Sequence, residues 1–236
     1  RRAKSSITVE QQQVRFQRDD LQLVIVEEVT DMSSPRLPQK EQQAERQIKI
    51  LAVFANPKGS DESRLGEENR TISECVAQCQ KRDNLHLKPL PAAHVRDLHR
   101  ALMDDDYQVV HFSGYATETG ELQFEDGNGE AKSVRKEALA ELLRLCSSVE
   151  CVILNAHHTL SQGQLIASGV SYTIAMDGPI SHEASRTFVR GFYDAIGSGR
   201  DYVDAFKQGR VALGLEGFSS QVIMTPQLLD QSSGGS

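Results

Sequence analysis

Two short stretches of the chain carry side chains that could move protons or attack a carbonyl group. One is His-Phe-Ser-Gly-Tyr at residues 111–115, and the other is Leu-Asn-Ala-His-His at residues 154–158. Imidazoles serve as general bases and metal ligands, and a hydroxyl beside a base can serve as a nucleophile. Each stretch follows an apolar run typical of a buried strand. If the two strands are neighbours in a parallel sheet, these side chains meet at one edge, where open α/β sheets bind ligands.

The histidines also fit simpler roles. His111 lies inside its apolar run, which favours a hydrogen-bonded core histidine over a general base. His157 and His158 are consecutive, and consecutive side chains at a strand end point to opposite sides, so we do not expect them to hold one metal ion. We predict no metal site and no cofactor.

The four cysteines lie in segments of apolar periodicity and are Cys75, Cys79, Cys146 and Cys151. Their spacing is not that of a metal site, so we expect buried or half-buried free thiols in a reducing, cytoplasmic compartment. Cys75 and Cys79 are one helical turn apart and could present two zinc ligands, but no second ligand pair follows. Cys146 as a relocated nucleophile is disfavoured because no base is spaced to meet it.

From residue 48 onward, apolar strands alternate with amphipathic helices, which predicts an α/β domain with a mainly parallel sheet. Strands are predicted at residues 48–55, 85–90, 107–113, 151–156 and 171–176. Helices are predicted at about residues 67–82, 93–103, 135–146, 162–168, 182–196 and 201–215. Asp-Gly-Asn-Gly at residues 126–129 predicts a β-hairpin turn.

The two ends of the chain differ from this central part. Residues 1–30 predict an extended segment that forms a β-hairpin, and residues 31–47 a linker. The α/β domain is expected over residues 48–220. The polar chain after Thr225-Pro226 predicts a disordered tail over residues 221–236.

Charge and hydropathy exclude several partners. The net charge is −7, and because the first 18 residues carry +4, the rest of the chain carries −11. An acidic body repels a phosphate backbone, which argues against nucleic acid. Neither a run of roughly 20 apolar residues nor a signal-like segment is present, so we expect no membrane span and no export. Asn-Pro-Lys-Gly at residues 56–59 lacks the spacing of a phosphate-binding loop.

Four motifs give the chain a family resemblance. They are Lys-Ile-Leu-Ala-Val-Phe-Ala-Asn-Pro at residues 49–57, Val-Val-His-Phe-Ser-Gly at 109–114, Val-Ile-Leu-Asn-Ala at 152–156 and Phe-Tyr-Asp-Ala-Ile-Gly-Ser-Gly at 192–199. In this order they resemble the CHAT domain, a caspase-like, separase-related cysteine peptidase module often fused to tetratricopeptide or signalling domains in bacteria. The resemblance covers about residues 49–217. It implies a three-layer α/β caspase-like fold with a mainly parallel sheet, to which the N-terminal hairpin is an addition.

The chain departs from the family's pattern at both catalytic positions. Family members usually follow the first motif with His-Gly, whose histidine is the general base, and this chain has Tyr115 and Ala116 there. They usually end the second motif in the nucleophilic cysteine, and this chain has His157. Tyrosine has an ordinary pKa of about 10 and is a poor base at neutral pH. The resemblance therefore implies a degenerate member, a pseudo-peptidase with no catalytic residue.

The other residues at these strand ends are expected to shape a cleft. The predicted cleft-lining residues are His111, Ser113, Gly114, Asn155, His158 and Asp177. Gly114 is expected to keep the turn after its strand tight. Asp177 could line a pocket for a basic side chain, as related peptidases do for arginine, or be an ordinary loop acid. Tyr115 is expected to fill the vacated cleft and to hydrogen-bond His157 through its hydroxyl.

Three functions remain open. We favour an interaction or regulatory module in a bacterial multidomain signalling protein, which binds a protein or peptide partner, an active peptidase or its own fused domains. The N-terminal hairpin could also drive self-association through an exposed edge. A second function is a residual or altered peptidase or hydrolase, with His157 or His158 as base and Ser113, Thr159 or water attacking, although no nucleophile-elbow motif supports it. The third is a folded spacer, which the absence of tryptophan weakly favours.

Overall fold

The structure is a computed structural model that describes residues 46–58 and 62–230. These residues fall within one compact unit of the chain, residues 44–236. The predicted N-terminal hairpin and nearly all of the predicted linker lie outside the described residues. Those two predictions therefore remain predictions.

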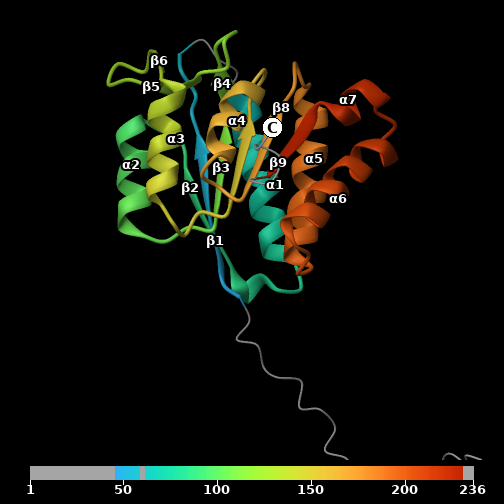
Figure 1. Cartoon of the computed structure of the whole chain (residues 1–236). Helices are drawn as coiled ribbons and strands as arrows, with labels where there is room; N and C mark the ends of the chain where they lie inside the picture. Colours follow the sequence, from blue (N-terminus) through green and yellow to red (C-terminus); the bar gives the residue numbers. More distant parts are fainter. Residues whose placement is uncertain (1–45, 59–61, 231–236) are drawn as a thin grey trace, which may run out of the picture. The chain divides into compact units, whose positions relative to one another are not determined.

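A six-stranded sheet runs through the middle of the domain in the order β2-β1-β3-β7-β8-β9 (Figure 1). The strands are β1 (Ile48–Phe54), β2 (Leu85–Leu90), β3 (Val109–Ser113), β7 (Cys151–Asn155), β8 (Tyr172–Met176) and β9 (Pro226–Asp230). The first five pair in parallel, and β9 pairs antiparallel with β8. The five predicted strands are all present, because uninterrupted apolar runs suit parallel strands that are covered on both faces.

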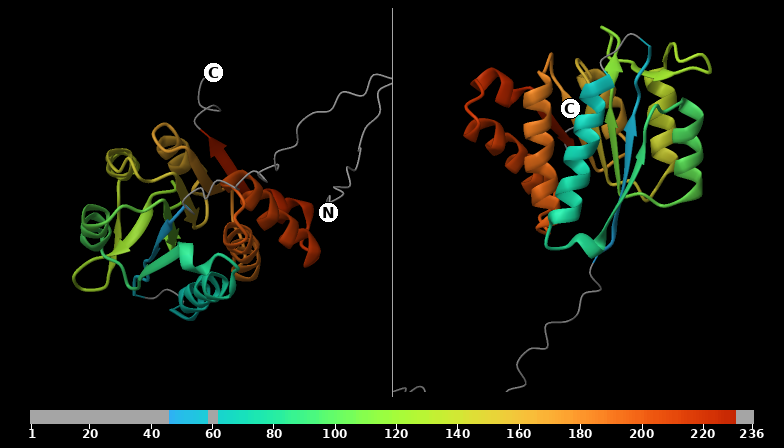
Figure 2. Two further views of the ribbon diagram at one scale, coloured as in Figure 1. Left: turned by 90° about the horizontal axis from the view of Figure 1, so that it is seen from below. Right: turned by 180° about the vertical axis from the view of Figure 1, so that it is seen from behind.

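Helices cover both faces of the sheet (Figures 1 and 2). The helices are α1 (Glu62–Gln78), α2 (Val95–Asp104), α3 (Lys136–Leu145), α4 (Leu160–Ala167), α5 (His182–Gly197) and α6 (Tyr202–Leu215), and a short 3₁₀ helix, Arg82–Asn84, precedes β2. One apolar cluster lies beneath α1 and α5, and a second lies beneath α2, α3 and α4. The predicted three-layer architecture is confirmed. The largest difference from the predicted helices is at α1, which begins at Glu62 rather than near residue 67.

The alternation of side chains along the strands decides which helix layer each one faces. In β3, Val109 belongs to the cluster beneath α1 and α5, so His111 and Ser113, two and four residues further on, face the same layer. In β7, Ile153 belongs to that cluster, so Asn155 faces it as well. Three polar side chains therefore project under α1 and α5 near the carboxyl end of the sheet.

A small antiparallel sheet follows β3 in the chain. Its strands are β4 (Tyr115–Ala116), β5 (Leu122–Glu125) and β6 (Ala131–Ser133), in the order β4-β5-β6. The hairpin predicted around residues 126–129 is confirmed, with the Asp126 carboxylate accepting hydrogen bonds from the backbone N–H groups of Asn128 and Glu130. The sequence did not predict β4, because two residues are too few to show a strand's alternation.

The prediction of a disordered tail over residues 221–236 is wrong for residues 221–230. The chain forms a short helix, α7 (Ser220–Met224), and then β9, which completes one edge of the sheet. Pro226 is compatible with this position because the first residue of an edge strand need not donate to a ladder. The Arg210 guanidinium also donates to the Pro226 carbonyl. The α/β domain therefore extends beyond the predicted boundary at residue 220.

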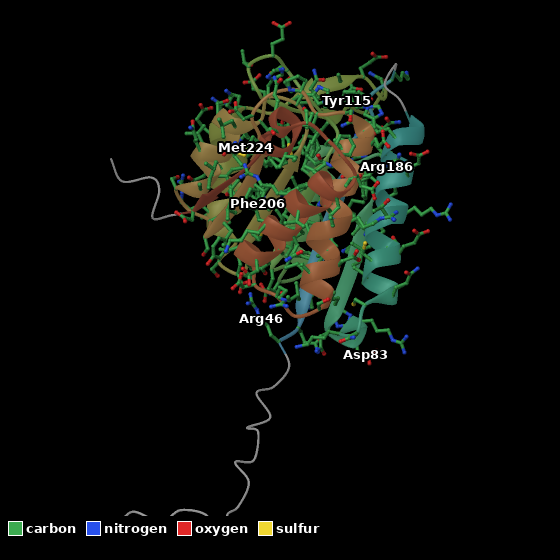
Figure 3. All side chains as sticks on the ribbon, turned by 90° about the vertical axis from the view of Figure 1, so that its right-hand side faces the viewer. Arg46, Asp83, Tyr115, Arg186, Phe206 and Met224 are labelled. Atoms are coloured by element: carbon green, nitrogen blue, oxygen red, sulfur yellow. The ribbon has the colours of Figure 1, made fainter. Side chains whose placement is uncertain are left out.

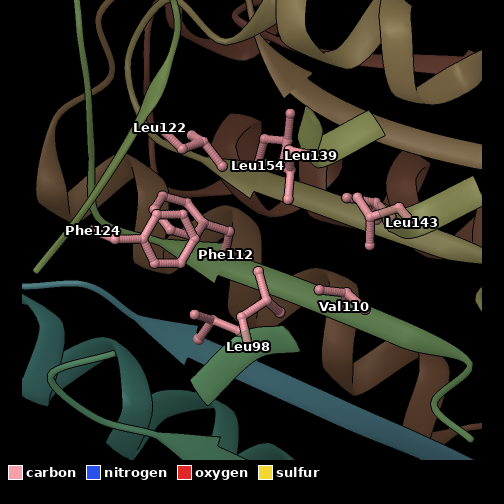
Figure 4. A pocket seen from close by; sticks show the side chains of 10 residues that line it. Leu98, Val110, Phe112, Leu122, Phe124, Leu139, Leu143 and Leu154 are labelled. Carbon is pink, nitrogen blue, oxygen red and sulfur yellow. The ribbon is translucent and has the colours of Figure 1, made fainter. Parts of the chain in front are cut away.

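The core beneath α2 and α3 contains a small apolar cavity of about 10 Å³ (Figure 4). Leu98, Phe112, Leu143 and Leu154 are among the side chains that line it. An apolar space of this size offers no polar partners to a water molecule. This half of the domain is therefore close-packed core, and the polar groups gather on the other face.

Candidate functional site

The candidate site begins where β3 and β7 end side by side. Ser113 and Asn155 are register partners in these neighbouring parallel strands, and each is the last residue of its strand. The segments that carry Tyr115 and His157 therefore leave the sheet at the same edge. The structure confirms that the two predicted stretches meet at the carboxyl end of the sheet, where α/β folds place their sites.

The turn after β3 requires a glycine. A Cβ atom on Gly114 would lie 2.9 Å from the carbonyl oxygen of Ala55 and 3.1 Å from the ring of Phe112. The backbone N–H of Ala55 also donates to the carbonyl of Ser113 at 3.1 Å. The chain after β3 thus passes close against the end of β1, which agrees with the predicted role of Gly114.

Tyr115 packs against a buried arginine of α1 (Figure 3 labels Tyr115). The guanidinium carbon of Arg64 lies 5.1 Å from the centre of the Tyr115 ring, within the range of a cation–π contact. Nη2 of Arg64 donates to the carbonyl oxygen of Gly114 at 3.4 Å. Arg64 is only 5 % exposed. Sequence reasoning missed this residue because it placed the start of the helix after it.

His157 is half-buried and lies in the field of Arg64. Desolvation lowers the pKa of His157, the positive charge of Arg64 lowers it further, and a hydrogen bond to the backbone of Ile180 acts in the opposite direction. The imidazole is therefore neutral at neutral pH. Within the described part of the chain, its buried Nε2 has no hydrogen-bond partner, so the hydrogen bond predicted from Tyr115 to His157 does not reach this nitrogen.

His158 is a turn residue. Its side chain is exposed, its φ is 57°, and its N–H donates to the carbonyl of Gly178 at 3.2 Å. In residues 46–58 and 62–230, there is no group of three or more His, Cys, Asp or Glu side chains placed to hold a metal ion.

His111 belongs to a buried polar network beneath the site. Its Nε2 lies 2.9 Å from Oε1 of Glu68 on α1, and its Nδ1 lies 3.0 Å from the hydroxyl of Tyr193 on α5. Because a carboxylate only accepts hydrogen bonds, Nε2 carries a proton and donates to Glu68, while Nδ1 is within hydrogen-bond distance of the Tyr193 hydroxyl. His111 is completely buried. The prediction of a satisfied core histidine is confirmed.

Asn155 ties the second strand into the same network. Its Nδ2 lies 2.6 Å from Oε1 of Glu68 and 2.6 Å from the hydroxyl of Ser185 on α5. Burial raises the pKa of Glu68, but the hydrogen bond and charge of His111, followed by the hydrogen bond from Asn155, outweigh it and leave the pKa below its ordinary value. Asn155 thus helps to fix β7 against α1 and α5.

The hydroxyl groups considered as nucleophiles serve the fold instead. Ser113 is completely buried under α1 and α5. Thr159 is also completely buried, and its Oγ1 lies 3.1 Å from the carbonyl oxygens of Leu154 and Ala156 and accepts from the backbone N–H of Met176. Neither hydroxyl is open to a substrate, which weakens the case for an altered hydrolase.

Sequence comparison provides the classification. A sequence model of the CHAT domain matches residues 6–216. The chain belongs to the CHAT domain family. The match begins at residue 6 and so includes residues before the four motifs. No curated protein sequence matches the chain.

Two solved structures are similar to the chain. A secreted C11 cysteine protease from Bacteroides thetaiotaomicron, solved with an irreversible peptide inhibitor, is 10% identical with a TM-score of 0.59, over 79% of this chain and 67% of that one. The Drosophila initiator caspase Dronc is 9% identical with a TM-score of 0.47, over 76% of this chain and 78% of that one. At such identities the likeness is one of fold, and the first structure confirms the caspase-like fold of this CHAT domain.

The four thiols of this CHAT domain are free and lie away from the site. Cys151 is the first residue of β7, at the opposite end of the strand from His157, and burial raises its pKa. Burial, with a smaller effect of the Asp194 charge, raises the pKa of Cys75 to about 12. Cys79 and Cys146 are half-buried, at the ends of α1 and α3. The predicted buried and half-buried free thiols are confirmed.

Asp177 follows β8 and is exposed. Its backbone N–H donates to the carbonyl of Thr225 at 2.8 Å, which links the end of β8 to the end of α7. A role for its side chain in a pocket stays a prediction. None of the described helices is long and apolar enough to cross a membrane.

Proposed function

We propose that this CHAT domain is a pseudo-peptidase that acts as a protein-interaction or regulatory module in a cytoplasmic, multidomain signalling protein of a bacterium. The observation that carries the proposal is the position of the cysteines. All four cysteines of the chain are described, and none stands at the strand end where the family's motif places the nucleophile. His157 occupies that position.

The residues present do not replace the missing pair. A cysteine peptidase needs a thiolate assisted by an imidazole, and backbone N–H groups that hold the oxyanion. Tyr115 stands at the general-base position, with its ring against the Arg64 guanidinium. His157 offers an imidazole with no thiol beside it. Loss of one member of such a unit costs several orders of magnitude in rate, and both are replaced here.

The strand ends expected to frame the predicted cleft are held in place. The ends of β3 and β7 are in register, Gly114 holds the turn, and the network around Glu68 joins both strands to α1. A rigid groove binds a peptide through backbone pairing and side-chain pockets without any nucleophile. The partners that fit are a protein or peptide segment, an active peptidase, or domains fused to this one.

The test restores the dyad. The triple variant Tyr115→His, Ala116→Gly, His157→Cys and the unmodified chain are each incubated with an unbiased peptide library, and new peptide termini are identified by mass spectrometry. The matched control carries the same first two changes with His157→Ser. We expect cleavage by the thiol variant, blocked by prior alkylation, and none by the other two proteins. Cleavage by the unmodified chain would overturn the proposal.

A further inference from the structure

The outer edge of the small antiparallel sheet is open. The order of this sheet is β4-β5-β6, so among the described residues β6 has a strand on one side only. All three residues of β6, Ala131 to Ser133, are exposed. Figure 1 shows β5 and β6 above α2 and α3, away from the middle of the large sheet. An open strand edge presents backbone N–H and C=O groups that can pair with another chain.

The hydrogen bonds of the hairpin show which backbone groups of β6 face outward. The N–H of Val134 donates to the carbonyl of Leu122 at 2.9 Å, so these two residues form a hydrogen-bonded pair. In an antiparallel ladder, hydrogen-bonded pairs alternate with pairs that exchange no hydrogen bond. Lys132, two residues before Val134, therefore bonds to β5 through its backbone. The backbone groups of Ala131 and Ser133 point away from β5, toward the exposed side of the strand.

A pocket of about 180 Å³ lies beside β6. It is lined by residues 94–96 at the start of α2, by residues 125–127 of the hairpin and by Lys132. His94 and Glu125 form a parallel β-bridge, and Nδ1 of His94 lies 2.9 Å from the carbonyl oxygen of Glu125. These contacts hold the start of α2 against the hairpin. One water molecule needs roughly 10–15 Å³, so the pocket has room for a side chain.

The charges around the pocket favour an acidic side chain. The two carboxylates of its lining are already bound by backbone donors: Glu125 accepts from the N–H of Asn56, and Asp126 accepts from two N–H groups of the hairpin. The cations are less committed. Lys132 forms no ion pair within residues 46–58 and 62–230, and Nε of Arg96 lies 3.9 Å from the carboxylate of the next residue. An acidic group in the pocket would therefore be complementary in charge to these two cations.

We propose that the outer edge of β6 binds an extended segment of a partner protein as an added strand, with an acidic side chain of that segment in the pocket. The inference rests on the proposed interaction function and adds a surface outside the predicted cleft. Directly opposite residues of neighbouring strands point to the same face, so the peptide residue opposite Lys132 points to the face that carries Lys132. Its carboxylate binds Lys132 and Arg96, while the peptide backbone pairs with Ala131 and Ser133.

Three peptides test the proposal by proton–nitrogen NMR spectra of the full chain. They are acetyl-Val-Thr-Glu-Thr-Val-amide, its counterpart with Gln in place of Glu, and the Glu peptide with both threonines N-methylated. The Glu peptide should shift the amide signals of Ala131 and Ser133 and bind about two- to fivefold more tightly than the Gln peptide, the size expected of an exposed ion pair. The N-methylated peptide, which lacks the N–H groups that pair with β6, should not bind. Unshifted signals at millimolar Glu peptide, equal affinity of the Glu and Gln peptides, or binding of the N-methylated peptide would overturn the proposal.

Variants assign the binding to this edge. Ser133→Pro removes an N–H that points away from β5, so it should abolish binding and leave Tm unchanged, because proline is tolerated at such a position of an edge strand. Lys132→Gln should remove the preference for Glu over Gln, while Lys207→Gln, on the exposed side of α6, should keep it. Should Ser133→Pro fail to fold, Lys132→Gln decides alone. Binding that survives Ser133→Pro in a folded protein, or a preference that survives Lys132→Gln, would overturn the proposal. Peptide cleavage by the unmodified chain is a separate outcome, which would overturn the proposed function instead.

Discussion

Replacing His111 with alanine tests whether this histidine serves the fold. The side chain is completely buried and contacts Glu68 and Tyr193 at 2.9 and 3.0 Å. In the alanine variant, the buried Glu68 carboxylate keeps Asn155 as a donor but loses the hydrogen bond from His111. Removal of one member of a buried charged pair costs about 3–5 kcal/mol. For a domain of this size each kcal/mol lowers Tm by roughly 2–4 °C, so Tm should fall by roughly 6–20 °C.

Urea unfolding followed by far-UV circular dichroism measures this loss. The matched control is His99→Ala, because His99 is exposed on α2 and its removal should change stability by no more than about 0.5 kcal/mol. If His111→Ala unfolds at the same urea concentration as the unmodified chain, the network around Glu68 does not hold the strands to α1. The structural role assigned to His111 would then be refuted.

The pH dependence of the unfolding free energy provides a second test of the network around Glu68. The folded-state pKa of Glu68 lies below its ordinary value of 4.5, so its ionised form stabilises the fold above that pH. This contribution is lost as the pH falls through the folded-state pKa. The difference in unfolding free energy between the unmodified chain and Glu68→Gln should therefore narrow below about pH 4.5. If the difference in unfolding free energy between the unmodified chain and Glu68→Gln stayed constant down to the pH of acid unfolding, the stabilising role assigned to ionised Glu68 would be contradicted.

Other consequences of the packing can be measured directly. Gly114→Ala places a Cβ 2.9 Å from the Ala55 carbonyl oxygen, and such overpacking should cost about 1–3 kcal/mol in urea unfolding; an unchanged midpoint would show that the turn relaxes. Leu143→Ala beside the apolar cavity should cost about 2–5 kcal/mol in thermal unfolding, and a loss below about 1 kcal/mol would contradict close packing there. Iodoacetamide at neutral pH should leave Cys151 and Cys75 unmodified in the folded protein, because burial raises their pKa values; rapid labelling of Cys151, read by peptide mass spectrometry, would contradict its burial.

The strands were predictable because a strand buried on both faces consists of an uninterrupted run of mainly apolar residues. The run ending in Asn155 reads as uninterrupted apolar residues, and β7 occupies all five of the residues 151–155. The same periodicity placed His111 inside a strand, and its burial followed from that. The meeting of Tyr115 and His157 at one edge then required only that the two strands be neighbours.

Glu68 and Arg64 were missed for a physical reason. The glycines at residues 59 and 66 suggested a loop, so the helix was predicted to begin near residue 67, whereas α1 begins at Glu62. The available signal was the spacing of Leu65, Glu68 and Ile72, which puts a carboxylate on the buried face of a helix. Its partner on β3 cannot be read from the spacing, because Glu68 and His111 are 43 positions apart in the chain and only the fold brings them together.

The C-terminal edge was missed because a short polar segment carries little periodicity. Residues 226–230 form β9 through backbone pairing with β8, and its half-buried Leu228 packs against the core. Pairing between backbone groups does not require particular side chains, so the residue types of this segment did not predict a strand. Pro226, the first residue of β9, favoured a chain end over an edge strand.

Incubation of the unmodified chain with an unbiased peptide library, read by mass spectrometry, tests the central claim most directly. The account predicts no new peptide termini above a blank without protein, because no thiol stands at the end of β7 and the nearby hydroxyls of Ser113 and Thr159 are buried. New termini that disappear in His157→Ala would contradict the account, since they would show that this imidazole supports hydrolysis in the cleft.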